Sequence, residues 1–476
     1  MRRTKIVCTI GPSCNTKKVL EQMLRNGMNV ARLNFSHGTH ETHKKDIETF
    51  RRVRDRLGMP AAIMLDTRGP EIRLRDFKEG SASLKCGEEY LLTTEEILGD
   101  DRCGSINCES LPRQLSPGNT ILIDDGRVSL KVIDADEKTV RCKVECGGVI
   151  SNRKGINIPN LYLDLPYLSE QDKKDIRFGI EQDVDFIAAS FVRRKEDVIT
   201  LRRFLDYYGG HSIKIISKIE NLEGVENFDA ILKHSDGIMV ARGDMGVEVD
   251  YDRLPGIQKR FIRRCYQSGK MVITATQMLE SMIKNPTPTR AEITDVANAV
   301  FDGTSAVMLS GETAVGKNPT LAVKVMAKIA ERAEHDAFEM GAYKGFNHDM
   351  DSTDITNAIC DATCTTARDI KAKAIVVVTK GGQTARRMSK FRPNEPIVAA
   401  TPVTKTYHQL SLSWGVYPVM ARYQSTTDEL FLHSVDCAKQ LDLVADGDRV
   451  VITAGVPLGI SGSTNIIKVQ VVGEQI

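Results

Sequence analysis

Two hydrophobic stretches of the sequence each end in a cation and a carboxylate that are two residues apart. The first stretch, residues 213–221, carries Lys218 and Glu220, and a second one, later in the chain, carries Arg242 and Asp244. Alternate residues of a β-strand point to the same face, so each pair is predicted to lie side by side where its strand stops. Two acidic strand ends together with a lysine indicate a site for a divalent metal and a phosphorylated ligand.

The two pairs can form one site only if their strands are parallel and end at the same edge. The sequence contains eight candidate strands, each followed by a helical pattern. The predicted strands are 5–8, 29–35, 61–65, 186–191, 213–219, 237–241, 271–275 and 305–309. Alternation of buried strands with helices is typical of a parallel α/β fold. Eight such units in about 240 residues predict a (β/α)8 TIM barrel, whose active face is formed by the loops after the strands.

Two further domains are predicted beside the barrel. Between residues 71 and 166 the helix–strand alternation gives way to alternating segments with Gly and Asp turns, which predict an inserted β-barrel domain. The barrel is then expected to comprise residues 1–70 and 167–340. A polar stretch at 347–349 indicates a linker, and residues 341–476 predict a C-terminal domain built on an open α/β sheet.

Composition excludes several classes of function. The chain has 476 residues, of which 41% are hydrophobic and 27% charged, as expected for a globular protein of several domains. Its 65 basic and 63 acidic residues nearly cancel, which gives no electrostatic reason to expect a nucleic-acid or membrane partner. The apolar run near the start is too short for a signal peptide or a membrane span. Eleven cysteines without zinc-ligand spacing favour free thiols in a reducing cytoplasm.

On a barrel, polar residues at the strand ends would converge on one rim. The residues at the predicted strand ends are Arg32, Asn34, Ser36, Asp66, Thr67, Lys218, Glu220, Arg242, Asp244, Thr274, Thr276, Ser310 and Glu312. Glu220 and Asp244 offer the hard oxygen ligands that suit Mg²⁺, and Lys218 and Arg32 could face a phosphoryl group. The alternative is a set of solvated loops in which the two carboxylates pair with Lys218 and Arg242.

A second candidate site lies in the C-terminal domain, where a glycine-containing loop follows a predicted strand and opens a helix. Backbone N–H groups at such a helix start favour an anion. The residues that could cradle a phosphate are Thr379, Lys380, Gly381, Gly382, Gln383 and Thr384. An ordinary strand-to-helix turn is the alternative, and the sequence contains no Walker A or Rossmann fingerprint.

At these residues the sequence resembles the pyruvate kinase family. The motifs that carry the resemblance are 31–38, 66–73, 213–225, 239–244, 275–282 and 308–314. The resemblance spans the whole chain, including the inserted and C-terminal domains. It implies a cytoplasmic glycolytic enzyme that transfers the phosphoryl group of phosphoenolpyruvate to ADP, giving pyruvate and ATP. Among bacterial members, it implies the type without an extra C-terminal domain.

The resemblance also implies roles for individual residues. Glu220 and Asp244 would hold Mg²⁺ or Mn²⁺, and Lys218 would stabilise the phosphoryl group during transfer. Phosphoenolpyruvate would be bound by Arg32, Lys218, Gly243, Asp244 and Thr276. K⁺ would be coordinated by Asn34, Ser36, Asp66 and Thr67. The nucleotide would be contacted by Asn34, His37, Arg73 and, from an inserted domain that closes as a lid, Lys154. Thr276 and Ser310 would belong to the route that protonates the enolate.

Regulation is implied by resemblance as well. Glu71 is similar to the residue of K⁺-dependent members, whereas independent members carry Lys, so K⁺ activation is expected. In relatives, loops that correspond to 379–384 and 454–464 bind a sugar-phosphate effector. Gly381-Gly382 replaces a Ser-Gly of many members, which removes one hydroxyl contact. A phosphorylated allosteric activator is expected, with fructose 1,6-bisphosphate, AMP and other sugar phosphates left open, in a homotetramer.

Two other functions stay open on the sequence. One is a different Mg²⁺-dependent barrel enzyme acting on pyruvate or phosphoenolpyruvate, such as a lyase or aldolase, which would need Glu220 and Asp244 but neither the lid nor Lys218. The other is a non-catalytic metabolite sensor. The presence of Lys218, Glu220, Asp244 and Thr276 argues against a sensor, because a decayed enzyme is expected to have lost some of them.

Overall fold

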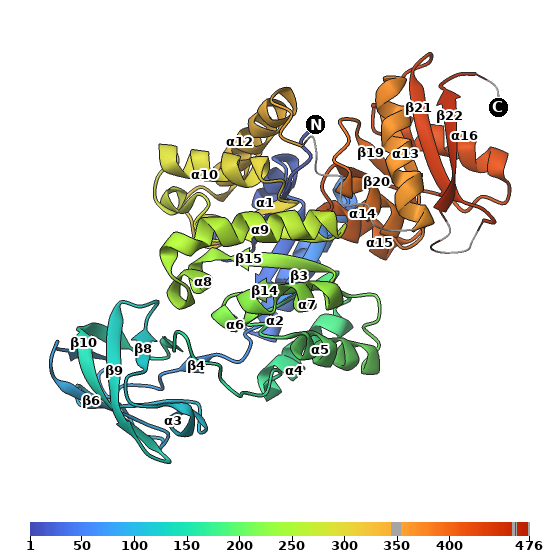
Figure 1. Ribbon diagram of the computed structural model, residues 1–476. Coiled ribbons are helices and arrows are strands. Elements are labelled where there is room, and N and C mark those ends of the chain that lie inside the picture. Colours follow the sequence, from blue (N-terminus) through green and yellow to red (C-terminus); the bar gives the residue numbers. More distant parts are fainter. Residues whose placement is uncertain (344–353, 459–461, 463, 475–476) are drawn as a thin grey trace.

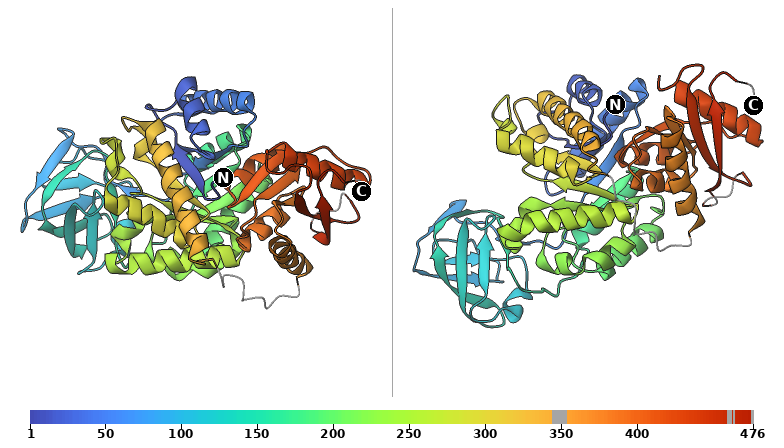
Figure 2. Two further views of the ribbon diagram at one scale, coloured as in Figure 1. Left: turned by 90° about the horizontal axis from the view of Figure 1, so that it is seen from above. Right: turned by 45° about the horizontal axis from the view of Figure 1, so that its top comes forward.

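The computed structural model describes residues 1–343, 354–458, 462 and 464–474. A central barrel is flanked by the β-rich insertion at one end and by the C-terminal α/β domain at the other (Figure 1). Figure 2 shows the same order of the three parts in two further views. The predicted linker at 347–349 and part of the loop 454–464 lie outside the described residues.

The predicted TIM barrel is confirmed. Eight parallel strands close into a ring in the order β1-β17-β16-β15-β14-β13-β3-β2. Their bounds are β1 (Lys5–Thr9), β2 (Val30–Asn34), β3 (Ala62–Asp66), β13 (Phe186–Ala189), β14 (Lys214–Ile219), β15 (Gly237–Ala241), β16 (Met271–Ala275) and β17 (Ala306–Leu309). The strands are buried almost throughout because the ring encloses one face and the surrounding helices cover the other.

Helices follow the strands and cover the ring. They are α1 (Lys17–Arg25), α2 (His40–Leu57), α4 (Glu170–Glu181), α5 (Lys195–Tyr207), α6 (Leu222–Glu226), α7 (Phe228–His234), α8 (Arg242–Glu248), α9 (Leu254–Gln267), α10 (Arg290–Phe301), α11 (Gly311–Ala314) and α12 (Pro319–Glu339), with 3-10 turns η1 (Tyr251–Arg253) and η2 (Glu280–Ile283). A capping box at Thr39 begins α2, and Gly58, at φ +63°, ends it. Leu20, Met23 and Leu24 form the buried face of α1.

Strand periodicity decides which residues of β14 reach the centre of the barrel. Ile215 and Ile219 belong to the hydrophobic core between strands and helices. Ile216 belongs instead to a separate cluster with Val7, Ala62 and other residues of the ring interior. Since alternate residues share a face, Lys218 has the same orientation as Ile216 and points toward the barrel axis.

The insertion is rich in β-structure, as predicted, and its main sheet has the order β4-β12-β8-β9-β10-β6-β7. These strands are β4 (Ile72–Arg73), β6 (Glu89–Thr93), β7 (Cys103–Ser105), β8 (Thr120–Ile123), β9 (Val128–Ala135), β10 (Thr139–Cys146) and β12 (Gly155–Asn157). A two-stranded sheet of β5 (Ser81–Leu84) and β11 (Gly148–Ser151) and the short helix α3 (Leu111–Gln114) complete it. The two edges of the seven-stranded sheet meet, because Leu74, directly after β4, bridges Ile106, directly after β7, and the Arg75 N–H donates to the Ser105 carbonyl at 2.7 Å. The sheet therefore closes on itself, and the predicted inserted β-barrel is confirmed.

Both connections of the insertion meet at the start of α4. Ser169 caps this helix, and Asp172 Oδ2 accepts a hydrogen bond from the Ser169 N–H at 3.2 Å. The other oxygen of Asp172 accepts one from the N–H of Gly69, in the outgoing connection, at 3.1 Å. Gly69 has φ +75°, and a Cβ there would lie 3.0 Å from both Ser190 and Phe191, so the outgoing chain is packed closely against the barrel.

The C-terminal domain contains the predicted open sheet, with the order β20-β19-β18-β21-β22 and an antiparallel last strand. Its elements are β18 (Ala374–Val378), β19 (Ile397–Thr401), β20 (Val416–Met420), β21 (Arg449–Gly455), β22 (Thr464–Val471), α13 (Ile355–Asp369), α14 (Gln383–Lys390), α15 (Thr404–Gln409), α16 (Thr427–Lys439) and η3 (Leu410–Leu412). Lys5 donates to the Val416 carbonyl at 2.7 Å, which ties the first barrel strand to this sheet. Among the described helices, none is long and apolar enough to cross a membrane.

Candidate active site

Lys218 is the centre of a buried polar network inside the barrel rim. Its Nζ lies 2.9 Å from Glu220 Oε1, so this predicted pair does lie side by side at the end of β14. The same Nζ lies 3.0 Å from Asp66 Oδ1 and donates to the Ser190 hydroxyl at 2.7 Å. Burial alone would lower the pKa of Lys218, but the carboxylates of Asp66 and Glu220 outweigh burial and raise that pKa above its usual value. The rim therefore holds a permanent positive charge.

A second cation reaches the network from β2. Arg32 Nε lies 2.6 Å from Asp66 Oδ2, and its Nη1 donates to the Thr9 hydroxyl at 2.8 Å. Burial would raise the pKa of Asp66, but the charges of Arg32 and Lys218 hold it below its usual value. One carboxylate at the end of β3 thus orients two cations that come from different strands, leaving both aimed at the same part of the rim.

Glu220 and Asp244 form the acidic part of the site. The pKa of Glu220 is raised to about 8, chiefly by burial; the Lys218 ammonium opposes the rise, and the negative charge of Asp244 contributes to it. The N–H of Phe191 donates to the second oxygen of Glu220 at 2.6 Å. A buried carboxyl group beside a second carboxylate is stabilised in its charged form by a bound cation, so this donor set fits a divalent metal.

The second predicted pair, Arg242 and Asp244, is not a strand-end pair. The chain turns into a helix at once after β15, and both residues lie in the first turn of α8. Arg242 pairs with Asp295 at 2.7 Å and donates to the carbonyl of Thr276 at 2.6 Å. Two positions along a helix do not share a face, so Arg242 supports the loop after β16 while Asp244 is left for the acidic pair.

The loops after β15, β16 and β17 are joined by hydrogen bonds that involve the other predicted substrate residues. The N–H of Gly243 donates to the Thr276 hydroxyl at 2.8 Å, and Thr276 has φ +70°, which is uncommon for a β-branched residue. Glu312 accepts from the N–H of Ser310 at 2.7 Å and from that of Leu279 at 3.0 Å. Glu312 therefore fixes the ends of two strands at once.

The predicted nucleotide residues are spread over the rim and the insertion. Arg73, in β4, donates through Nε to Glu71 at 2.6 Å, and Lys154 pairs with Asp124 at 2.7 Å within the insertion. The side chain of His37 is exposed in the loop after β2. Arg73 is paired with Gly155, the neighbour of Lys154, and the His37 N–H donates to the Asn34 carbonyl at 3.2 Å. A ligand between the insertion and the rim would connect these two groups of residues.

The predicted K⁺ residues lie at the ends of the adjacent strands β2 and β3. Asn34 Oδ1 accepts the N–H of Ser36 at 3.1 Å, and the Thr67 carbonyl accepts the Ser190 hydroxyl at 2.6 Å. All four offer oxygen atoms, which suits a hard monovalent cation.

The chain was then compared with known proteins. Residues 1–323 match the family model of the pyruvate kinase barrel domain, and residues 357–470 match that of the pyruvate kinase alpha/beta domain. The chain belongs to the pyruvate kinase family. As a member, it is a phosphotransferase of glycolysis, and the lyase, aldolase and sensor alternatives are set aside. Enzymes of this family require metal ions.

Individual pyruvate kinases match the chain over almost its entire length. The protein from Clostridium acetobutylicum is 48% identical over 477 residues, covering 99% of this chain and 100% of the relative. That from Staphylococcus haemolyticus is 48% identical over 481 residues, covering 100% of this chain and 81% of the relative. The crystal structure of a pyruvate kinase from Cryptosporidium parvum superposes with a TM-score of 0.91 at 40% identity, covering 99% of this chain and 96% of the other.

In this chain the sequence did not reveal the role of the loop after β13. Residues 190–193, here called the β13 loop, contribute the Ser190 hydroxyl to Lys218 and the Phe191 N–H to Glu220. The predicted strand 186–191 ends at Ala189, and Phe191 takes a left-handed φ of +52°. The one signal in the sequence was a serine at the end of a predicted strand, the same signal that marked the other rim residues.

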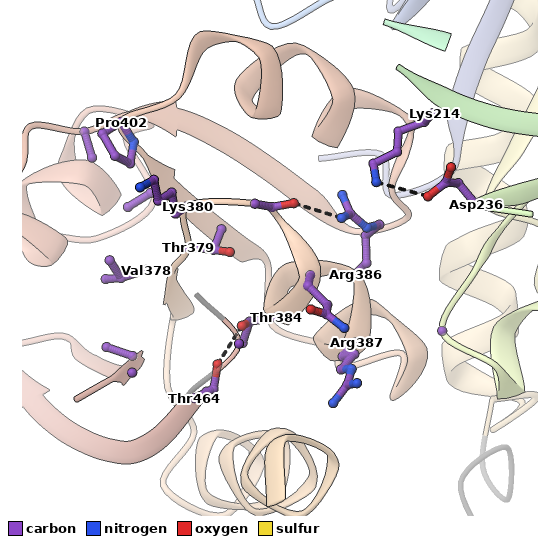
Figure 3. Close-up of a pocket in the computed structure, with 18 of the residues that line it drawn as sticks. Lys214, Asp236, Val378, Thr379, Lys380, Thr384, Arg386, Arg387, Pro402 and Thr464 are labelled. Atoms are coloured by element: carbon purple, nitrogen blue, oxygen red, sulfur yellow. Dashed lines mark hydrogen bonds and ion pairs between the residues drawn. The ribbon is translucent and has the colours of Figure 1, made fainter. Parts of the chain in front are cut away.

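The predicted effector loop lines a cavity of about 940 Å³ between the C-terminal domain and the barrel. Gly382 has φ +76°, and its N–H donates to the Thr379 hydroxyl at 3.0 Å, while the Thr384 and Thr464 hydroxyls lie 2.6 Å apart. Figure 3 shows Lys214 and its partner Asp236 from the barrel facing the loop of Thr379, Lys380 and Thr384. The cavity lies away from the catalytic rim, at the opposite ends of the same strands.

Proposed function

We propose that the chain transfers the phosphoryl group of phosphoenolpyruvate to ADP at the barrel rim, with Mg²⁺ held by Glu220 and Asp244. The observation that carries the proposal is the buried network that joins Lys218 and Arg32 to Asp66 and Glu220, with the half-buried Asp244 close enough for its charge to act on Glu220. Both substrates are anions, so fixed positive charge is needed to bring them together. Mg²⁺ (or Mn²⁺), when bound, would neutralise phosphoryl oxygens and the developing charge.

Lys218 and Arg32 are proposed to act directly on the phosphoryl group. Because Asp66 orients both side chains, they need little reorganisation when charge develops on the oxygens in flight. In the proposed reaction, the P–O bond to the enol oxygen breaks and a new P–O bond forms to the terminal phosphate of ADP. The released enolate then takes a proton on carbon, and Thr276 and Ser310, at the ends of the neighbouring strands β16 and β17, are proposed to supply its route.

The insertion is proposed to close as a lid over the nucleotide. Arg73 and Lys154 carry the charges that would meet the nucleotide phosphates, with His37 and Asn34 on the barrel side. Both cations now pair with carboxylates of their own region, Glu71 and Asp124. Closure would exclude water from the transfer, which strengthens the electrostatic interactions of the rim. We propose boundaries at 70/71, 166/167 and 340/341 for the three domains.

We propose that Asn34, Ser36, Asp66 and Thr67 hold K⁺ next to the phosphoryl site. The support is the oxygen-only donor set at the ends of β2 and β3. Glu71 gives further support, because burial raises its pKa, while Arg73 and the more distant Lys218 lower it. Its carboxylate is thus within electrostatic reach of the catalytic lysine, at a place where a Lys ammonium could stand in for K⁺.

The interdomain cavity is proposed to bind a phosphorylated allosteric activator. One phosphate would bind at the start of α14, near residues 379–384, where N–H groups and threonine hydroxyls are available. Basic residues outnumber acidic ones in the lining, which contains Arg202, Lys214, Lys233, Lys270, Lys380, Arg386, Arg387 and Arg422 against Asp206 and Asp236. A ligand with a second anionic group could therefore bridge both domains. Since Lys214 begins β14 and Lys218 lies near its end, such a bridge would act on the strand that carries the catalytic lysine.

A homotetramer in the cytoplasm is proposed from family membership, and size-exclusion chromatography with light scattering tests the assembly. One assay tests the main proposal: coupling pyruvate formation to a dehydrogenase in the presence of phosphoenolpyruvate, ADP, Mg²⁺ and K⁺. We expect turnover that depends on all four components. Absence of pyruvate formation under these conditions, from folded protein, would refute the proposed reaction.

A further inference from the structure

The β13 loop lies between the catalytic groups and the insertion and contacts both. On one side, the Phe191 N–H donates to Glu220 at 2.6 Å, and Ser190 Oγ accepts from Lys218 at 2.7 Å and donates to the Thr67 carbonyl at 2.6 Å. Two charged groups of the rim are thus hydrogen-bonded to two consecutive residues. The left-handed φ of Phe191 is uncommon for an aromatic residue, so the conformation of this loop depends on the contacts that surround it.

On its other side, the β13 loop holds the chain that returns from the insertion. Arg193 Nη1 donates to the carbonyl of Leu163 at 2.9 Å, and Nη2 donates to that of Leu165 at 2.8 Å. Both leucines pack against the hydrophobic core of the insertion. Tyr167 adds a third contact, from its hydroxyl to the Ser190 carbonyl at 3.2 Å. The side chains of the returning segment therefore pack against the insertion, whereas its backbone carbonyls accept hydrogen bonds from the barrel.

The guanidinium of Arg193 is itself fixed. Asp197 accepts from the Arg193 N–H at 3.0 Å and from its Nε at 3.3 Å, and both residues are buried. The Asn227 side chain donates to the Arg193 carbonyl at 3.0 Å. A planar guanidinium that is held by a carboxylate and donates to two carbonyls is a rigid link, because its donors keep a fixed geometry.

We propose that Arg193 is a positioning residue that couples the place of the insertion to the orientation of the metal ligand Glu220. A shift of residues 163–165, as the lid moves, would displace the guanidinium and with it the β13 loop. The Phe191 N–H would then leave or approach the Glu220 carboxylate. This inference rests on the proposed function, in which Glu220 binds the metal and the insertion acts as a lid. It goes further by naming the link between the two.

The test uses Arg193→Lys and, as a matched control, Arg194→Lys. A lysine at position 193 keeps a positive charge beside Asp197 but cannot donate to both leucine carbonyls. Arg194 is the adjacent arginine, yet it is partly exposed and only approaches Asp164 and Glu223, at 3.9 and 3.8 Å. Mn²⁺ binding to the substrate-free protein is measured from the free-ion EPR signal. Hydrogen–deuterium exchange follows residues 161–167 and the peptide that contains Phe191 in metal-free protein.

We expect Arg193→Lys to weaken Mn²⁺ binding about tenfold, the usual effect of losing support behind a metal ligand, and to speed exchange in both segments. Arg194→Lys should change neither. Faster exchange at 161–167 with unchanged Mn²⁺ affinity would show that Arg193 only holds the returning segment in place, which would contradict the coupling. No change in either measurement would also contradict it.

Tyr167→Phe is a second variant that tests the same coupling if Arg193→Lys does not fold. It removes only the hydroxyl on the Ser190 carbonyl, and we expect weaker Mn²⁺ binding, by a smaller factor. Unchanged Mn²⁺ affinity in this variant would contradict the proposal. Glu220→Gln separates the two levels of inference: if it binds Mn²⁺ as tightly as the unsubstituted protein, the metal assignment has failed, and the coupling falls with it.

Discussion

The ammonium group of Lys218 lies 3.0 Å from Asp66 Oδ1, although the two residues are 152 positions apart in the sequence. They sit at the ends of β14 and β3, which are separated in the ring by β13. Closing the barrel therefore creates the contact, and the same carboxylate also orients Arg32. The charge that would meet the phosphoryl group is thus a property of the folded ring rather than of one loop.

Replacing Lys218 tests the role of this charge. Lys218→Met should lower kcat for phosphoryl transfer about a thousandfold or more, because a preorganised charge at the transferred group is lost. Exchange of the pyruvate methyl protons with solvent, followed by NMR in D₂O, should stay measurable, since enolisation does not require a cation at the phosphoryl group. Lys174→Met, at an exposed position of α4, is the matched control. Phosphoryl transfer at the normal rate in Lys218→Met would contradict the assignment.

K⁺ dependence is expected from Glu71. At saturating Mg²⁺, K⁺ should increase turnover at least about tenfold over Na⁺, which corresponds to about 1.4 kcal/mol at the transition state. Glu71→Lys should remove most of this dependence by placing an ammonium group near the proposed K⁺ site, whereas Glu71→Gln should not. Steady-state rates in KCl, NaCl and tetramethylammonium chloride at equal ionic strength measure the effect. A small gain from K⁺ in the unsubstituted enzyme would refute the prediction.

Stability should fall in mild acid because of His408. The pKa of this histidine is lowered to about 4, chiefly by burial and in part by the nearby charge of Arg54. The unfolded chain takes up a proton near pH 6.5 while the folded chain does not, so stability is lost as the pH falls from 6.5 toward 4. Between pH 7 and pH 5 this histidine should cost about 2 kcal/mol of unfolding free energy.

Urea denaturation at both pH values measures this loss in the unsubstituted protein and in His408→Phe, which has no proton to bind. The variant should lose less stability over the same interval. His335→Phe, at an exposed position of α12, should behave like the unsubstituted protein. Equal losses in the unsubstituted protein and His408→Phe would show that another group controls the acid sensitivity.

Activation by an effector should depend on Lys380 in the interdomain cavity. Lys380→Ala should raise the concentration of a sugar bisphosphate needed for half-maximal activation about tenfold, because one charge-assisted contact to phosphate is lost. Titration calorimetry with the same ligand checks the affinity directly. Lys373→Ala changes an exposed lysine of the same domain outside the cavity lining and should have no effect. Equal affinities for both variants would place the phosphate elsewhere.

The sequence was most informative where local pattern decides structure. The run 237–241 was predicted with the bounds that β15 has, and β14 differs by a single residue at its start. Eight hydrophobic strands with intervening helices are compatible with few folds, and the closed (β/α)8 barrel is the one that the pattern predicts. Glu220 and Lys218 were paired correctly because strand periodicity alone places them on one face.

Residues whose position depends on distant contacts were harder to predict. Arg242 and Asp244 have the same spacing as Lys218 and Glu220, but a helix starts at Arg242, and nothing local distinguishes the two cases. The role of Phe191 comes from its backbone N–H and an unusual φ, which side-chain chemistry does not reveal. Long-range pairing also decides the strand order of the insertion, in which the segments after β4 and β7 meet at Leu74 and Ile106, and the alternating pattern of the strands does not reveal that order.

Asp172 has a consequence for how this architecture can be altered. Its two oxygens bind the outgoing chain at Gly69 and the returning chain at Ser169, so the insertion leaves and re-enters the barrel at one point. The inserted segment of nearly a hundred residues therefore starts and ends at neighbouring points of the barrel. A domain joined in this way can be shortened, exchanged or replaced by a tight turn without changing the strand order of the ring. The insertion is, in this sense, a separable part of the fold.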